Sequence, residues 1–233
     1  MLDVIVRGAY VADGTGNPGY VADVAVAGAR IAAVGRLDGA QAHTIIDGSG
    51  KVVCPGFIDT HLHSEVELLA GVHTAGVQMG VTTEFICPDG MGFACLPQNL
   101  LADYWRYVYG IYGDSREMAG WTTVRDYLNA FTGRAHNNIV SMAPHGAIRL
   151  AACGWKTGPA TPDELAQQKR LVHEWMEAGA VGLNTGLGYA PAAYADAHEI
   201  AELCKVTAPY GGVYTAHMRN YGSERDDSIA ETS

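Results

Sequence analysis

Two histidines one residue apart, His61 and His63, are the side chains of this chain best suited to chemistry. They end a stretch that begins at Cys54 and continues as Pro-Gly-Phe-Ile-Asp. Because side chains alternate between the two faces of a β-strand, both imidazoles would point the same way. Imidazole nitrogens are common ligands of zinc and related metals. The spacing therefore predicts part of a metal site, although a His-x-His pair taken alone is about as often structural.

Three further residues with metal-binding side chains follow later predicted strands. Asp89, His145 and His217 each come at the C-terminal end of a run rich in β-branched residues. Taken singly, Asp89 fits an ordinary Pro-Asp-Gly turn, and each histidine fits a structural position. Together they indicate a common site, because barrels of alternating strands and helices carry their chemistry at the C-terminal ends of the strands.

The elements that would position these residues alternate between strand and helix patterns, which is typical of a parallel α/β sheet or barrel. The clearest helix begins at Thr161-Pro-Asp-Glu, a capping-box pattern with proline at the first helical position, and ends at Gly179. Residues 93–118 show no clean period and predict a long loop-like insertion. The expected strands are 57–63, 82–87, 139–143, 180–185 and 213–217, with further helices over 66–80, over 122–131 and after an Asp196 cap.

The first 55 residues have a different pattern. Short β-branched runs alternate there with turn sequences rich in glycine, aspartate and asparagine, and no helical period occurs. We expect residues 1–55 to form part of a small β-sandwich that precedes the catalytic domain.

Composition excludes several classes of function. The net charge of −10 and the lack of a Lys/Arg cluster argue against a nucleic-acid partner. No run of about 18 apolar residues predicts a transmembrane helix, and the N-terminus lacks the basic region of a signal peptide. The 5 scattered cysteines do not form a disulfide framework. A cytoplasmic protein is expected, and no feature indicates an oligomeric state.

Two segments carry a specific resemblance to a known family. Residues 179–191 resemble the GLSTGLxYxP segment, and residues 210–219 the GGxYxxHMR segment, of the N-acyl-D-amino-acid deacylases, or D-aminoacylases. This family belongs to the metal-dependent amidohydrolase superfamily, whose first barrel strand the stretch through His63 also resembles. The resemblance covers nearly the whole chain, including 81–83 and 144–149. It implies a (β/α)8, TIM-like barrel, of which residues 56–233 would supply the first five β/α units.

The resemblance also implies a zinc site. His61 and His63 would hold one zinc ion and His217 a second. The bridging position is a cysteine in the best-known D-aminoacylases, whereas this chain has Asp89 at the aligned position. An aspartate can bridge two zinc ions through its oxygens. Cys87 shares the strand parity of Asp89 and remains a weaker alternative, so the sequence leaves the bridging ligand and the choice between one and two ions open.

Three residues are implied as substrate contacts. Arg219 could hold the carboxylate of an amino acid through a bidentate pair, and His145 could hydrogen-bond the substrate or a metal ligand. Tyr189 would lie at the mouth of the barrel. The structural alternatives are a covering aromatic side chain for Tyr189 and a surface ion pair of Arg219 with Glu224 or Asp226.

The activity that the resemblance implies is zinc-dependent hydrolysis of N-acyl-D-amino acids. A metal-bound hydroxide would attack the amide carbon, releasing a carboxylate and a free D-amino acid. The family places its proton-shuttling aspartate on the eighth strand, which would lie beyond Ser233. Because a full barrel needs about 250 residues, we expect this chain to be an incomplete fragment, truncated after about five strands, without deacylase activity by itself.

Two alternatives remain open. A cyclic amidase of the hydantoinase or dihydropyrimidinase kind shares the first motif but uses a carboxylated lysine on its fourth strand. Residues 182–185 contain no lysine, which disfavours that class. A non-catalytic metal-binding fragment would bind the ion without hydrolysis. The identity of the acyl group and the preference for the D-isomer are not determined by these motifs.

Overall fold

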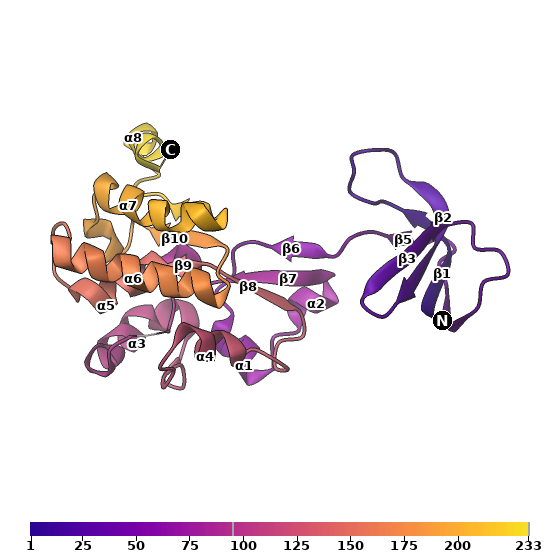
Figure 1. Ribbon diagram of the computed structural model, residues 1–233, viewed down its shortest axis with the longest axis horizontal. Helices are drawn as coiled ribbons and strands as arrows, with labels where there is room; N and C mark the ends of the chain where they lie inside the picture. The colour runs from indigo at the N-terminus through magenta and orange to yellow at the C-terminus, as the bar shows by residue number, and fades with distance from the viewer. Residues whose placement is uncertain (95, 233) are drawn as a thin grey trace. The chain divides into compact units, whose positions relative to one another are not determined.

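The computed structural model describes residues 1–94 and 96–232, and it divides into two compact units, Met1–Gly56 and Phe57–Ser233 (Figure 1). Each unit has its own sheet structure, and the boundary lies in the Pro-Gly sequence before His61. None of the helices within the described ranges is long and apolar enough to cross a membrane.

The first unit is a five-stranded sheet in which β1 is central. β1 pairs antiparallel with β2 and parallel with β4 and β5, and β3 pairs antiparallel with β2. A bulge between Val6 and Ala9 shifts the register of β1, so the buried side chains of Ile5, which pairs with Ala25, and Val11, which pairs with Tyr20, lie on opposite faces of the sheet. The strands are β1 (Leu2–Val11), β2 (Tyr20–Ala27), β3 (Arg30–Gly35), β4 (Ala42–Asp47) and β5 (Val52–Val53).

The second unit has two three-stranded parallel sheets, whose strands follow one another in sequence order. One sheet has the order β6-β7-β8 and the other β11-β10-β9. Parallel neighbours joined by helical connections are the wall of a β/α barrel that does not close within the described residues. The strands are β6 (Phe57–Asp59), β7 (Val81–Ile86), β8 (Asn138–Ser141), β9 (Ala143–Pro144), β10 (Gly182–Gly186) and β11 (Val213–His217).

Helices cover these sheets. α6 and α7 pack side by side (Figure 1), and α6 contacts β9 while α7 contacts β10. The core between helices and sheets includes Tyr127, Trp175 and Leu183. The helices are α1 (Glu65–Ala70), α2 (Ala75–Gln78), α3 (Gln98–Tyr112), α4 (Val124–Asn129), α5 (His145–Cys153), α6 (Pro162–Ala178), α7 (Ala197–Thr207) and α8 (Arg225–Thr232), with 3₁₀ turns η1 (Pro88–Gly90), η2 (Ala192–Tyr194) and η3 (Ala208–Tyr210).

The capping predictions are confirmed. The Thr161 side chain accepts a hydrogen bond from the Glu164 amide, and the Glu164 side chain accepts one from the Thr161 amide at 2.7 Å, a complete capping box. Gly179 ends α6 in the left-handed conformation. Asp196 caps α7 by accepting from the Glu199 amide at 2.8 Å. Local sequence therefore determines where these two helices begin.

The predicted loop at 93–118 is wrong, because α3 occupies most of it. The buried side chains of α3 are Leu101, Tyr104, Val108 and Tyr112, spaced three or four residues apart on one face. Two of these positions are tyrosines, whose polar hydroxyl hides the apolar period when the residues are counted by type. Both tyrosines pack edge-on against Phe93.

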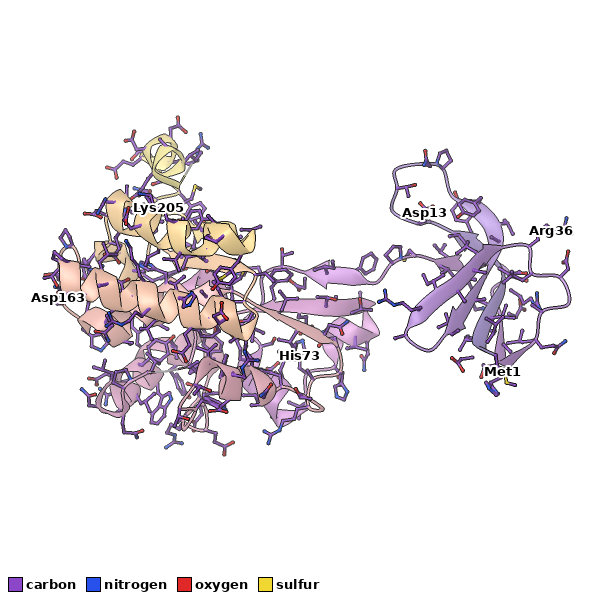
Figure 2. The ribbon with its side chains drawn as sticks, in the orientation of Figure 1. Met1, Asp13, Arg36, His73, Asp163 and Lys205 are labelled. Atoms are coloured by element: carbon purple, nitrogen blue, oxygen red, sulfur yellow. The ribbon has the colours of Figure 1, made fainter. Side chains whose placement is uncertain are left out.

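The single helix predicted at 66–80 is also wrong. Gly71 takes the left-handed conformation (φ +71°) and ends α1, and α2 is a separate single turn. Between them lies His73, which is labelled in Figure 2. Its Nδ1 is 3.1 Å from Glu67 Oε2 of α1, and its Nε2 is 3.1 Å from Glu84 Oε1 of β7, a fully buried carboxylate. The break between α1 and α2 thus places the His73 imidazole in contact with the buried Glu84 carboxylate.

We expect this contact to make stability depend on pH. Burial lowers the pKa of His73, but its hydrogen bond to Glu67 and the charge of Glu84 outweigh burial and raise the pKa above the usual value. Because its pKa is raised in the folded state, protonated His73 stabilises the fold. This stabilisation is complete below the unfolded-state pKa of about 6.5 and is lost as the pH rises through the folded-state pKa. The unfolding free energy of the wild type should therefore exceed that of His73→Gln more at pH 6 than at pH 9.

The measurement is urea unfolding followed by tryptophan fluorescence, since all 4 tryptophans lie in the second unit. His198→Gln, which removes an exposed imidazole from α7, is the matched control and should show no such dependence. A pH-independent difference between wild type and His73→Gln would contradict the prediction.

Candidate metal centre

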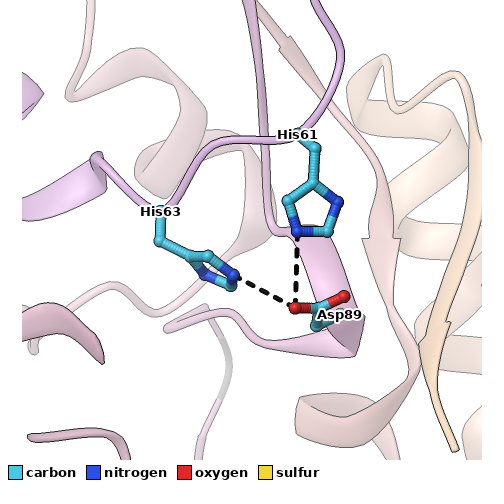
Figure 3. A group of neighbouring side chains, drawn as sticks. All are labelled: His61, His63 and Asp89. Atoms are coloured by element: carbon cyan, nitrogen blue, oxygen red, sulfur yellow. Dashed lines mark hydrogen bonds and ion pairs between the residues drawn. The ribbon is translucent and has the colours of Figure 1, made fainter. Parts of the chain in front are cut away.

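His61 and His63 lie just beyond the end of β6. The strand stops at Asp59, earlier than predicted, and Asp59 Oδ1 accepts a hydrogen bond from the His61 amide at 3.1 Å. The imidazoles nevertheless converge: His61 Nε2 is 3.4 Å and His63 Nε2 3.2 Å from the same Oδ2 atom of Asp89 (Figure 3). The convergence comes from this turn, since the two histidines are outside the strand.

Asp89 is carried by an unusual turn at the end of β7. Cys87 (φ +64°) and Asp89 (φ +53°) are both in the left-handed region, a conformation that costs about 1–3 kcal/mol for each non-glycine residue. The turn is held from the neighbouring sheet, where Asn184 Oδ1 accepts from the Gly90 amide at 2.6 Å and Asn184 Nδ2 donates to Thr215 Oγ1 at 2.5 Å. These two hydrogen bonds of Asn184 connect the turn to β10 and β11 and thereby orient the Asp89 carboxylate.

Cys87 does not belong to the described metal-type group of His61, His63 and Asp89. It is completely buried, with its Sγ 3.8 Å from Ser141 Oγ and 4.0 Å from the Tyr127 hydroxyl. Burial raises the pKa of its thiol well above the ordinary value, which disfavours the thiolate that binds metals. The parity argument that kept Cys87 as an alternative does not apply, because β7 ends at Ile86 and the left-handed residues that follow do not alternate between faces.

His217 approaches Asp89 from the opposite side. Its Nδ1 lies 3.4 Å from Asp89 Oδ1, at the end of β11. The Tyr189 hydroxyl is 3.4 Å from the same nitrogen, and the two rings pack with centroids 4.6 Å apart. One carboxylate oxygen of Asp89 thus faces His61 and His63, and the other faces His217.

The donor set fits a metal ion. Ligand atoms of His61, His63 and Asp89 all lie within 4.8 Å of one another. Asp89 Oδ1 is buried and accepts no hydrogen bond, a costly state for a carboxylate oxygen unless a cation is near. Burial raises the pKa of Asp89, but the His63 hydrogen bond and the nearby imidazoles outweigh burial and lower it. Neutral nitrogens with one anionic carboxylate are a ligand set that zinc accepts.

His145 belongs to a different cluster. It is completely buried at the start of α5, with Nε2 3.0 Å from Glu199 Oε1, and the guanidinium of Arg149 pairs with the other oxygen of Glu199. Burial raises the pKa of Glu199, but the hydrogen bonds from His145 and Arg149 outweigh burial and hold the pKa at about 2. His145 therefore joins α5 to α7, and the described metal-type group does not include it.

Arg219 ties the end of β11 to the segment after Tyr189. Its Nε and Nη2 donate to the Glu231 carboxylate at 2.9 and 2.7 Å, and its Nη2 and Nη1 also donate to the carbonyl oxygens of Ala195 and Ala193. The ion pair foreseen as the structural alternative is present, but with Glu231 of α8 in place of Glu224 or Asp226. In this arrangement, four of the five guanidinium N–H groups are directed at protein oxygens.

Sequence reasoning missed three residues that support the centre. Asn184 holds the Asp89 turn, the Tyr112 hydroxyl lies 3.0 Å from His63 Nδ1, and Glu65 accepts from Tyr112 at 3.3 Å. Glu65 had a weak signal, since it follows the His-x-His pair by two residues at a helix start. Tyr112 had none, because it was assigned to a loop.

Comparisons with known proteins show the family of this chain. The amidohydrolase family model matches residues 44–223. A D-aminoacylase of Alcaligenes xylosoxydans xylosoxydans is 36% identical over 99% of this chain and 47% of its own length. An N-acyl-D-glutamate deacylase of the same organism is 34% identical over 99% of this chain and 46% of its own length. The chain thus spans about half the length of these relatives.

Solved structures show the same likeness. A D-aminoacylase crystal structure superposes with a TM-score of 0.87 at 36% identity, covering 100% of this chain and 48% of that one. The N-acyl-D-glutamate deacylase of Bordetella bronchiseptica, complexed with zinc and a phosphonate inhibitor, gives 0.83 at 31% identity, covering 99% and 48%. A D-hydantoinase gives 0.53 at 16% identity, which shows the fold alone. The predicted barrel class is confirmed, and the chain belongs to the amidohydrolase family.

Proposed function

We propose that this chain carries the metal centre of a zinc-dependent deacylase that hydrolyses N-acyl-D-amino acids to a carboxylate and a free D-amino acid. The observation that carries the proposal is the Asp89 carboxylate, buried between His61 and His63 on one side and His217 on the other. The names of the two Alcaligenes relatives support the substrate class, and the zinc-containing Bordetella structure supports the metal.

In this proposal His61, His63 and Asp89 hold one zinc ion, and Asp89 with His217 provides the place for a second. Bound zinc would supply a Lewis acid that polarises the amide carbonyl and lowers the pKa of a water molecule towards about 7. Asp89 would supply the negative charge that attracts the zinc ions. The hydrogen bond between the Gly90 amide and Asn184 would hold the turn so that both carboxylate oxygens stay in position.

The substrate-binding roles differ among the three candidate residues. Tyr189 contacts His217 directly, so its hydroxyl is placed to hydrogen-bond a substrate oxygen beside the centre. The Arg219 guanidinium is occupied by Glu231 and two carbonyl groups, and His145 by Glu199. We therefore assign His145 and Arg219 to positioning the backbone segments around the substrate site. Arg219 positions the segment that follows Tyr189.

The proposal also covers organisation and location. Residues 1–55 would be the N-terminal part of a β-sandwich, and residues 56–233 the first β/α units of the hydrolase barrel. The net charge of −10 supports a small-molecule substrate over a nucleic acid. A cytoplasmic location is consistent with the same features of the sequence.

The test uses the complete product of the gene that encodes this chain, loaded with zinc. We expect it to release free amino acid from N-acetyl-D-leucine faster than from N-acetyl-L-leucine, to lose this activity on chelation and to regain it when zinc is restored. The 233-residue chain alone should bind zinc without turnover.

Two outcomes would contradict the proposal. Opening of hydantoin or dihydropyrimidine rings without cleavage of linear N-acyl amino acids would identify a cyclic amidase. Tight zinc binding by the complete product with no hydrolysis of either substrate class would identify a non-catalytic metal-binding protein. Free amine detection with both enantiomers in parallel reports cleavage of the linear substrates, and colorimetric detection of the ureido acid product reports ring opening, which releases no free amine.

A further inference from the structure

Glu65 is a completely buried carboxylate that the ligand set does not use. It is the first residue of α1 and follows His63 by two positions. Its Oε1 accepts a hydrogen bond from the Cys87 amide at 2.8 Å and another from the Tyr112 hydroxyl at 3.3 Å. Burying a carboxylate costs free energy unless hydrogen bonds stabilise it. Each of these two partners is connected to a residue of the candidate metal centre.

The first partner leads to His63. The Tyr112 hydroxyl lies 3.0 Å from His63 Nδ1, and the two rings meet edge-to-face with centroids 5.3 Å apart. When the phenol donates its only proton to Glu65, its oxygen can accept from an Nδ1–H group of His63. That tautomer leaves a lone pair on Nε2, the nitrogen that faces Asp89 at 3.2 Å.

The second partner leads to Asp89. Cys87 opens the left-handed turn that carries Asp89, and its amide is held by the same Glu65 oxygen. Glu65 therefore contacts, through one atom, the backbone that presents the carboxylate ligand and the phenol that orients an imidazole ligand.

We propose that Glu65 and Tyr112 form a positioning pair that presents His63 Nε2 and the Asp89 turn to the metal. This inference rests on the zinc centre of the proposed function. Hydrogen bonds to the far nitrogen of a ligating histidine select its tautomer and ring orientation, and their loss typically weakens metal binding roughly 10- to 100-fold.

The test compares zinc affinities by competition with a chromophoric chelator. Tyr112→Phe keeps the ring packed against Phe93 and removes only the hydroxyl, so the variant should fold and bind zinc roughly 10- to 100-fold more weakly. Tyr109→Phe makes the same change on an exposed face of α3 and should match the wild type. The ¹⁵N chemical shift of His63 Nδ1 should move in Tyr112→Phe and stay unchanged in Tyr109→Phe.

Glu65 is tested by a pair of variants. Glu65→Gln retains an oxygen that accepts from both the Cys87 amide and the Tyr112 hydroxyl, so it should keep zinc affinity close to that of the wild type. Glu65→Met has a similar length without an acceptor and should weaken binding at least as much as Tyr112→Phe. Should Glu65→Met fail to fold, the Tyr112 and Tyr109 variants decide the question.

The outcomes separate the two proposals. Wild-type zinc binding that Tyr112→Phe leaves unchanged would overturn the positioning pair while the deacylase proposal stands. A wild-type chain that binds no zinc would instead overturn the metal centre on which both depend.

Discussion

Replacing Asp89 by asparagine is expected to weaken zinc binding by more than about 100-fold, beyond the loss seen when an outer hydrogen-bond partner is removed. The substitution takes away the negative charge that faces three imidazoles and leaves a neutral amide in a buried position. Asparagine suits the position structurally, because with aspartate it is among the non-glycine residues that tolerate a positive φ best. The turn should therefore survive while its ligand is lost.

The measurement is the zinc dissociation constant of the 233-residue chain, with unfolding followed in parallel to show that the variant is folded. Asp103→Asn is the matched control, because it removes an exposed carboxylate on α3 that pairs with Arg106 across one helical turn. It should bind zinc as the wild type does. An Asp89→Asn variant with unchanged affinity would show that Asp89 is not a ligand.

Replacing Gly186 by alanine is expected to damage both stability and metal binding. Gly186 ends β10, and a Cβ atom there would lie 2.1 Å from the carbonyl oxygen of Asp89 and 2.8 Å from a ring carbon of Tyr189. The first of these atoms is backbone, so the clash can be relieved only by moving the turn that carries the ligand. Forced overpacking of this kind costs about 1–3 kcal/mol, and zinc affinity should fall as well.

Gly110 offers the matched control for Gly186. It lies within α3, and a Cβ added there meets no atom within 4 Å. Gly110→Ala should therefore stabilise the second unit by about 0.5–1 kcal/mol through helix propensity, with zinc binding unchanged. Urea unfolding and chelator competition measure the two effects. Wild-type stability and affinity in Gly186→Ala would show that the close approach of β10 to the Asp89 turn is not as described.

The first residues of two helices were predictable, because local side chains cap them. The capping box at Thr161 and the Asp196 cap depend on side chains that bond to amides three residues away, so sequence alone locates them. α3 was not predictable in the same way, since Tyr104 and Tyr112 are buried only because Phe93 and neighbouring elements surround them.

The choice between Asp89 and Cys87 shows a second limit. Strand parity placed both residues on one face, but the backbone leaves the strand at Ile86 and turns through left-handed residues. The stabilisation of that turn comes from Asn184, almost a hundred positions later in the chain. No local pattern around Cys87 specifies it.

The sequence by itself determined the types of the ligands and the edge of the sheet where they gather, because parallel strands joined by helices place their C-terminal ends together. It thereby selected His61, His63, Asp89 and His217 as candidate ligands, and the structure brings their side chains together. Tertiary structure alone decided which atoms meet: the orientation of Asp89 between the imidazoles, the link from Glu65 through Tyr112, and the partner of Arg219. These contacts join residues distant in sequence, and only packing brings such residues within hydrogen-bonding distance.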